Sequence, residues 1–207
     1  MRPKIKICGI TNLYDARLAV ELGTDMLGFN FYPPSPRYID PQSAADIIAA
    51  LPDSVIKVGI FVNEPAPQIH GLRQIVRLDY VQLHGDEDAH YCRSVREPGV
   101  RVIKALRIGE AADLQRMADY EVDLILLDTF NEKLYGGAGE TFNWDWLTPE
   151  VAQNVILAGG IGPENIEAAL RLRPWGIDLC SGVEVEKGKK DVGKMKQLFE
   201  KINQHER

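Results

Sequence analysis

Hydrophobic and polar positions follow two alternating patterns along the chain. Short apolar runs rich in β-branched residues recur at even intervals, and each is followed by a stretch with helical spacing of its apolar residues. This alternation is typical of βα units on a parallel sheet. The strand candidates are Ile5–Ile10, Met26–Phe31, Ile56–Val62, Tyr80–Leu83, Val102–Leu106, Leu124–Leu127, Val155–Ala158 and Ile177–Cys180. The helix candidates are Leu13–Leu22, Pro41–Leu51, Pro65–Val76, Glu87–Arg96, Ala111–Tyr120, Trp144–Val151, Pro163–Leu172 and Asp191–Ile202.

Eight consecutive units favour a closed (β/α)8 barrel, the TIM barrel, because an open doubly wound sheet uses about five or six strands. Asp40-Pro41 and Gly162-Pro163 predict helix starts, and Gly23 predicts a left-handed helix end. The chain shows no composition break or long linker. We therefore expect a single α/β domain, a barrel of eight parallel strands over residues 1–207.

Composition narrows the choice of partner. The 207 residues carry 24 Lys and Arg against 30 Asp and Glu, a net charge of −6, which argues against nucleic acid and anionic membranes. No apolar run is long enough for a signal peptide or a membrane span. Cys8, Cys92 and Cys180 form neither a disulfide framework nor a metal motif, which favours a reducing cytoplasm. We expect a small-molecule partner and, by default, a monomer, since no long apolar surface helix stands out.

Reactive groups in such barrels stand where the strands end. Strand alternation puts Lys6 and Cys8 on one face, opposite Ile5 and Ile7, so Cys8 faces the barrel interior. Cys8 is then either a small buried hydrophobe or a thiolate that acts as base or nucleophile. Asp128 directly follows an apolar strand, and it is either a loop carboxylate or a general acid whose pKa an apolar barrel mouth raises.

Three further features could bind a ligand. The glycines after the seventh and eighth strands could cradle a phosphate with their backbone N–H groups, although tight turns alone would also explain them. Arg37 ends a proline-rich loop that would suit capture of a carboxylate, unless it is merely solvated. Gln82 and His84 share a strand face, where His84 is either a donor to a ligand or a structural residue. The glycine-rich segment 135–142 predicts a mobile lid, and it lacks the ending of a nucleotide-binding loop.

Together these motifs resemble the phosphoribosylanthranilate isomerase family of tryptophan biosynthesis, nearly end to end and in the same order. The motifs are Lys6-Ile-Cys-Gly-Ile-Thr-Asn12, Gly28-Phe-Asn-Phe-Tyr32, Ser35-Pro-Arg-Tyr38, Gly59-Ile-Phe-Val-Asn63, Val81-Gln-Leu-His-Gly85, Leu127-Asp128, Gly136-Gly137, Thr141-Phe142, Trp144, Leu157-Ala-Gly-Gly160 and Ser181-Gly-Val-Glu184.

The resemblance implies an Amadori rearrangement of N-(5′-phosphoribosyl)anthranilate to 1-(2-carboxyphenylamino)-1-deoxyribulose 5-phosphate without metal or organic cofactor. It implies that Asp128 is the general acid that opens the furanose ring and that Cys8 is the general base that takes the C2′ proton. Arg37 would pair with the anthranilate carboxylate, and Gln82 and His84 match the family without an assigned step. The resemblance assigns the phosphate to the backbone around Gly159, Gly160, Ser181 and Gly182.

The chain departs from the family pattern at Ala138, where Ser or Thr is expected, and at Cys180, where Ser is expected. Ala138, together with Glu140, is expected to alter lid closure or phosphate affinity. Since the first and eighth strands of a closed barrel are neighbours, Cys180 and Cys8 are expected to lie close, and oxidation would then block the base.

Two alternatives stay open. Another phosphosugar barrel enzyme should show metal-ligating His and Asp at several strand ends, or a catalytic Lys/Glu set. A non-catalytic phospholigand-binding barrel would have no reason to keep both Cys8 and Asp128. The chain's other candidate charges, Lys4, Lys6, Lys104 and Asp178, are expected to form ion pairs inside the barrel.

Overall fold

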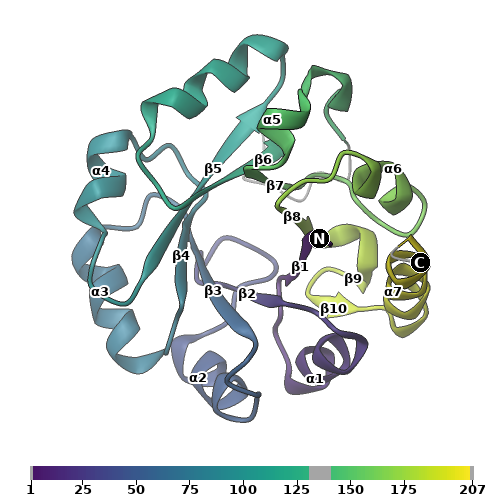
Figure 1. Ribbon diagram of the computed structural model, residues 1–207. Coiled ribbons are helices and arrows are strands. Elements are labelled where there is room, and N and C mark those ends of the chain that lie inside the picture. The colour runs from purple at the N-terminus through teal and green to yellow at the C-terminus, as the bar shows by residue number, and fades with distance from the viewer. Residues whose placement is uncertain (1, 131–140, 206–207) are drawn as a thin grey trace.

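The computed structural model describes residues 2–130 and 141–205, and within them eight parallel strands close into a ring in chain order (Figure 1). The predicted barrel is therefore confirmed. The strands are β1 (Lys4–Cys8), β2 (Met26–Asn30), β3 (Ile56–Phe61), β4 (Tyr80–Leu83), β5 (Arg101–Ile108), β6 (Leu124–Thr129), β7 (Val155–Leu157) and β8 (Gly176–Leu179).

Helical segments surround this ring (Figure 1). They are α1 (Leu13–Leu22), α2 (Pro41–Ala49), α3 (Ala66–Ile75), α4 (Ala89–Ser94), the 3-10 segments η1 (Ala111–Asp119) and η2 (Trp144–Trp146), α5 (Pro149–Ala152), α6 (Ile166–Arg171) and α7 (Val192–His205). Helix α7 packs against α1 and α6 and so covers the place where the ring closes. No helix in the described part of the chain is both long and apolar enough to cross a membrane.

The predicted helix ends are partly right. Asp40 caps α2 by accepting a hydrogen bond from the Ser43 N–H, with Pro41 in the first turn. Gly23 ends α1 in the left-handed conformation with a φ of 101°. The start predicted at Pro163 is wrong, since α6 begins at Ile166. The Asn165 side chain accepts from the Gly162 N–H and donates to the Gly160 carbonyl, which holds this stretch in a turn before the helix.

Two cores lie on the two faces of the ring. Outward-facing residues such as Ile5 and Ile7 belong to the large core between strands and helices, as the strand alternation predicts. The barrel interior is a smaller core of branched and other apolar side chains, which is how barrels of this class fill their centre. Its members are Met26, Val58, Tyr80, Ile103, Ala105, Leu126, Ile156 and Ala158.

The ion pairs are distributed differently from the prediction. Lys6 and Asp178 do pair inside the barrel, with Nζ 2.9 Å from Oδ1. Lys104, however, shares the outward face of β5 with Val102 and Leu106, and its Nζ lies 2.7 Å from Oε2 of Glu87. Lys4 pairs at 2.8 Å with Asp25, and its side chain is 47% exposed. The Lys104–Glu87 pair is therefore buried outside the barrel interior, whereas the Lys4–Asp25 pair lies at the surface.

Aspartates brace the amino-terminal rim of the ring. Asp25, Asp79 and Asp123 immediately precede β2, β4 and β6, and each accepts a hydrogen bond from a backbone N–H of the preceding strand. The donors belong to Ile5, Lys57 and Val102, at distances of 2.9, 2.7 and 2.8 Å. These bonds tie neighbouring strands at the end of the barrel away from the candidate site.

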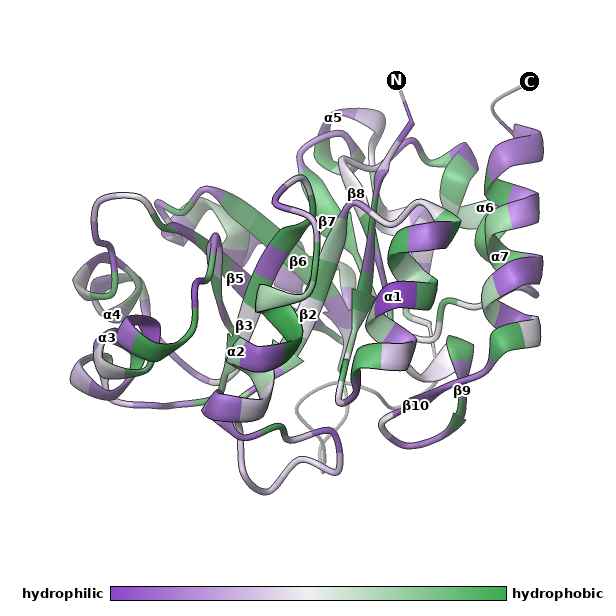
Figure 2. Ribbon diagram, turned by 90° about the horizontal axis from the view of Figure 1, so that it is seen from below, coloured by the Kyte–Doolittle hydropathy of each residue, from purple (hydrophilic) through white to green (hydrophobic). Residues whose placement is uncertain are grey.

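A small hairpin follows β8 that the sequence did not predict. After the 3-10 turn η3 (Ser181–Val183), the strands β9 (Glu184–Glu186) and β10 (Lys189–Lys190) pair antiparallel. Figure 2 shows the hairpin at the end of the barrel opposite the N-terminus, where strands β1 to β8 end. It therefore adds Glu184 and Lys190 to the candidate site.

The buried Lys104–Glu87 pair gives a test of the fold. Replacing Lys104 by Met should lower the free energy of unfolding by about 3–5 kcal/mol, because it leaves the Glu87 carboxylate buried without its cation. The matched control is Lys4→Met at the exposed pair with Asp25, for which we expect less than about 1 kcal/mol. Urea unfolding measures both, and equal losses would contradict this account of the buried pair.

Candidate active site

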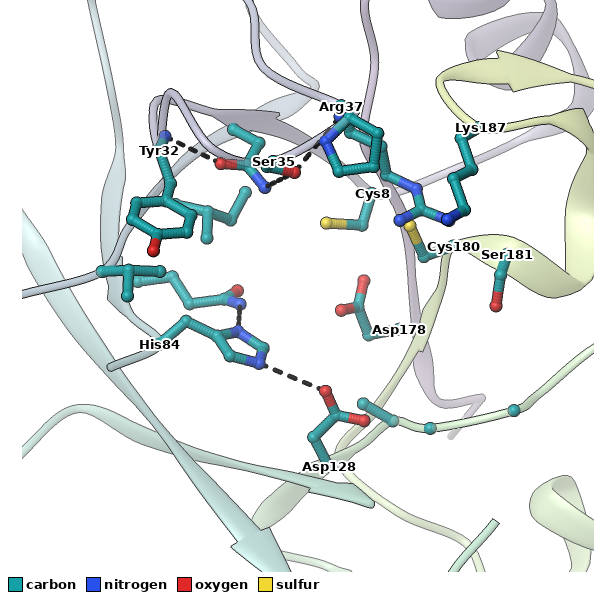
Figure 3. Close-up of a pocket in the computed structure, with 18 of the residues that line it drawn as sticks. Cys8, Tyr32, Ser35, Arg37, His84, Asp128, Asp178, Cys180, Ser181 and Lys187 are labelled. Atoms are coloured by element: carbon teal, nitrogen blue, oxygen red, sulfur yellow. Dashed lines mark hydrogen bonds and ion pairs between the residues drawn. The ribbon is translucent and has the colours of Figure 1, made fainter. Parts of the chain in front are cut away.

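A pocket opens at the carboxyl ends of the barrel strands (Figure 3). Eight of the nine residues predicted for the site line it. They are Cys8, Arg37, Gln82, His84, Asp128, Gly159, Gly160 and Ser181. The ninth, Gly182, does not line the pocket. The pocket is also lined by residues that did not enter the predicted site, among them Asp178, Cys180 and Lys187.

Cys8 ends β1 and is half-buried at the floor of the pocket, inside the barrel as predicted. A hydrogen bond from the Cys180 thiol, with the positive charges of Lys6, Lys190 and His84, holds the pKa of Cys8 well below its usual value against the cost of burial. The backbone carbonyl of Cys8 also accepts a hydrogen bond from Lys190 Nζ at 2.6 Å. Cys8 is therefore set up to be a thiolate, as a base or nucleophile requires.

Asp128 lies across the pocket from Cys8 and is held by hydrogen bonds (Figure 3). Its Oδ1 accepts from the Thr129 N–H at 2.8 Å, and its Oδ2 lies 3.2 Å from His84 Nε2. His84 Nδ1 is in turn 2.8 Å from the side-chain amide of Gln82. The surroundings of Asp128 are therefore more polar than the apolar barrel mouth that the sequence predicted. Gln82 and His84 therefore orient this carboxylate through a chain of two contacts.

Asp178 also lines the pocket. The sequence analysis expected Asp178 to form an ion pair, and it did not count Asp178 among the site residues. It is buried on β8 beneath Cys8 and pairs with Lys6. Burial raises the pKa of Asp178 to about 7, since the attraction of Lys6 is offset by repulsion from Cys8 and Asp128. The sequence could have predicted Asp178 as a site residue, because the alternation of residues along β8 places it on the inner face of the barrel, as the alternation along β1 does for Cys8.

Arg37 lines the pocket, but it is already bound within the protein. Its Nε and Nη2 contact the Glu184 carboxylate at 2.9 and 2.7 Å, and both side chains are buried. Although burial opposes its charge, this carboxylate raises the pKa of Arg37 further. Among the described residues, Nη1 has no hydrogen-bond partner, so it is the nitrogen available to a ligand.

Arg37 also explains why Gly9 must be glycine. Gly9 has a φ of +74°, and a Cβ there would stand 2.7 Å from the Arg37 Cδ. A side chain at position 9 would therefore displace the guanidinium from its place beside Glu184.

The loops after β7 and β8 touch each other. Gly159 and Gly160 have φ values of +87° and +58°, in the left-handed region that favours glycine. A Cβ on Gly159 would lie 3.0 Å from Asp128 Oδ1, and a Cβ on Gly182 would collide with the carbonyl oxygen of Ile161. Gly182 therefore acts by letting the second loop pack on the first, although it does not face the pocket.

The remaining predictions for the site have different outcomes. Cys8 and Cys180 are neighbours as expected, while their oxidation stays a prediction. The glycine-rich segment proposed as a lid, with Ala138 and Glu140, lies outside the described residues except for Thr141 and Phe142. Within residues 2–130 and 141–205, no group of three or more His, Cys, Asp or Glu side chains is arranged to hold a metal ion.

Comparison with known proteins agrees with this geometry. Residues 5–201 match the family model described as N-(5′-phosphoribosyl)anthranilate (PRA) isomerase. A curated relative of that name from Pelobacter propionicus is 47% identical over 198 residues, which span 95% of this chain and 93% of the relative.

Solved structures are similar over the whole chain. The phosphoribosyl anthranilate isomerase of Thermus thermophilus is 40% identical with a TM-score of 0.89, covering 99% of each chain. That of Thermotoga maritima is also 40% identical, with a TM-score of 0.90, and covers 98% of this chain and 99% of its own. A further structure of such an isomerase, in complex with reduced 1-(o-carboxyphenylamino)-1-deoxyribulose 5-phosphate, is 39% identical with a TM-score of 0.87, and covers 98% of this chain and 99% of its own.

The setting of Asp178 can be tested by titration. In protein labelled with carbon-13 aspartate, one carboxyl resonance should titrate with a midpoint near pH 7, since burial raises the pKa of Asp178 to about 7. It should vanish in Asp178→Asn. Asp40 is the matched control, because it is exposed and hydrogen bonds at the start of α2 lower its pKa. If the Asp178 resonance titrated together with that of Asp40, this account of the barrel interior would be wrong.

Proposed function

The chain belongs to the N-(5′-phosphoribosyl)anthranilate isomerase family, and on that premise we propose that Asp128 and Cys8 carry the two proton transfers of its reaction. The enzyme isomerises N-(5′-phosphoribosyl)anthranilate to 1-(2-carboxyphenylamino)-1-deoxyribulose 5-phosphate in tryptophan biosynthesis. The observation that carries the proposal is the placement of the Cys8 sulfur and the Asp128 carboxyl group on facing walls of one pocket (Figure 3). A reaction that needs one acid and one base needs this arrangement.

Asp128 acts first. It gives a proton to the furanose ring oxygen as the bond from that oxygen to C1′ breaks, and the nitrogen lone pair forms the C1′=N bond of a protonated Schiff base. Asp128 is positioned for this step by two contacts: His84 Nε2 lies 3.2 Å from its Oδ2, and the Thr129 N–H donates to its Oδ1 at 2.8 Å.

Cys8 acts second. Its thiolate takes the proton from C2′, and the electrons of that bond form C1′=C2′ while the C1′=N bond becomes a single bond. The resulting enolamine tautomerises to the ketone, with a proton returned to C1′. No atom is gained or lost overall. Lys6 and Lys190 favour the thiolate before this step, because each places an ammonium group near it.

Binding is assigned to groups around the rim. Arg37 offers Nη1 to the anthranilate carboxylate, while Glu184 holds the guanidinium in place through the other two nitrogens. The phosphate is assigned to the backbone around Gly159, Gly160, Ser181 and Gly182, because Gly159 and Gly160 adopt left-handed conformations and Gly182 lets the second loop pack closely on the first.

The alternative barrel functions have less support. A metal-dependent phosphosugar enzyme or a non-catalytic binding barrel would not account for a lowered Cys8 pKa opposite Asp128. The single domain over residues 1–207, the monomer and the cytoplasmic location all stay predictions. So does the lack of nucleic-acid and membrane partners.

The proton transfers are tested by following the loss of fluorescence of the substrate made in situ. Cys8→Ser and Asp128→Asn should each lower kcat by about 10²–10⁴-fold, since each removes one acid-base group. Wild-type protein no faster than buffer would overturn the function. An active wild type with full kcat in either variant would overturn that residue's role only.

The phosphate cradle is tested at Gly182. Gly182→Ala should raise KM at least about tenfold, because the Cβ pushes the two loops apart where Gly182 meets Ile161. Gly71→Ala in α3 is the matched control, since nothing lies within 4 Å of its Cβ position. It should leave KM unchanged and stabilise the fold by about 0.5–1 kcal/mol. An unchanged KM in a folded Gly182→Ala protein would contradict the cradle.

A further inference from the structure

Lys187 lines the pocket, but the proposed reaction gives it no role. It lies on the turn between β9 and β10, and its side chain extends from this hairpin toward the Arg37 guanidinium (Figure 3). Within residues 2–130 and 141–205, the Lys187 ammonium group has no hydrogen-bond or ion-pair partner. Lys187 therefore brings an unpaired positive charge to one wall of the pocket.

The turn that carries Lys187 is held against the loop of Arg37. The next residue, Gly188, is buried and has a φ of +85°. Its backbone N–H donates to Glu184 Oε1 at 3.3 Å, which ties the turn to the carboxylate that also holds Arg37. A Cβ on Gly188 would lie 3.4 Å from the carbonyl oxygen of Pro36, the residue before Arg37. The hairpin therefore keeps Lys187 beside Arg37.

This wall of the pocket carries more positive charge than its own carboxylate balances. Arg37 and Lys190 approach the Glu184 carboxylate to 2.7 and 2.9 Å, so one negative charge already serves two cations. Lys187 adds a third cation that has no carboxylate of its own among the described residues. An anion bound between Arg37 and Lys187 would relieve the repulsion between them.

From this arrangement we infer that Lys187 is a further substrate-binding residue, which together with Arg37 clamps the anthranilate carboxylate and makes the enzyme selective for substrates that carry it. The inference deepens the proposed function and rests on the assignment of that carboxylate to Arg37. One carboxylate can bind both cations, because its two oxygens accept about four hydrogen bonds. The phosphate is the substrate's other anion, but it is assigned to the loops after β7 and β8, whereas Lys187 lies beside the loop of Arg37.

The experiment compares the binding of two inhibitors that differ only in the carboxylate. One is the product reduced at its ketone, and the other is the same compound made from aniline instead of anthranilate. Lys187→Met should weaken binding of the first about five- to tenfold, as expected for a charged contact at a partly exposed site, and leave binding of the second unchanged. Lys187→Arg keeps a cation and should restore most of the affinity. Calorimetric titration at low ionic strength measures each Kd, because salt screens the contact.

Lys189→Met is the matched control. Lys189 belongs to the same hairpin, but its side chain is 63% exposed, pairs with Glu186 at 3.5 Å and does not line the pocket, so both affinities should stay unchanged. Equal losses for the two inhibitors in Lys187→Met would place Lys187 at the phosphate and overturn the inference, as would no loss for either. If the wild-type protein bound neither inhibitor, or bound both equally well, the proposed function or its assignment of the carboxylate would be overturned instead.

Discussion

The site depends on one buried ion pair, Lys6 with Asp178, which places two charged groups inside an otherwise apolar barrel. Lys6 and Asp178 are both buried among branched side chains, where an unpaired ion would be costly. Their contact at 2.9 Å makes the pair tolerable. Although burial opposes the charge of Lys6, its pKa is raised by Asp178 and by Cys8, so the ammonium is permanent and supports a thiolate above it. The reactive sulfur therefore depends on an ion pair that the reaction does not consume.

A second layer of charge surrounds this centre. Glu184 binds both Arg37 and Lys190, and against the cost of burial these cations lower its pKa. One carboxylate thus fixes the guanidinium at the rim and the ammonium group behind Cys8. The hairpin of β9 and β10 is short, but it carries both Glu184 and Lys190. Substrate recognition and the state of the base are linked through the same side chain.

The sequence was most informative where a side chain's position follows from periodicity. Alternation along β1 placed Cys8 inside the barrel, and the run before Asp128 placed it at a strand end. Periodicity says nothing about partners that are distant in the chain. Arg37 was expected to be free for a ligand, yet its partner Glu184 is 147 residues away. The β9–β10 hairpin was missed because its few residues are mostly charged, and its two strands have only three and two residues.

The site lies along the line where the ring closes, and this has a consequence for folding. The rim aspartates join residues 20 to 22 positions apart, whereas Lys6 and Asp178 are separated by 172 positions and Lys190 and Cys8 by 182. Closing so long a loop costs about 2 kcal/mol more chain entropy than closing a short one. Contacts of this separation are slow to form. Strand pairs can therefore assemble locally before the last seam forms, and only a chain that has completed its ring possesses a reactive sulfur.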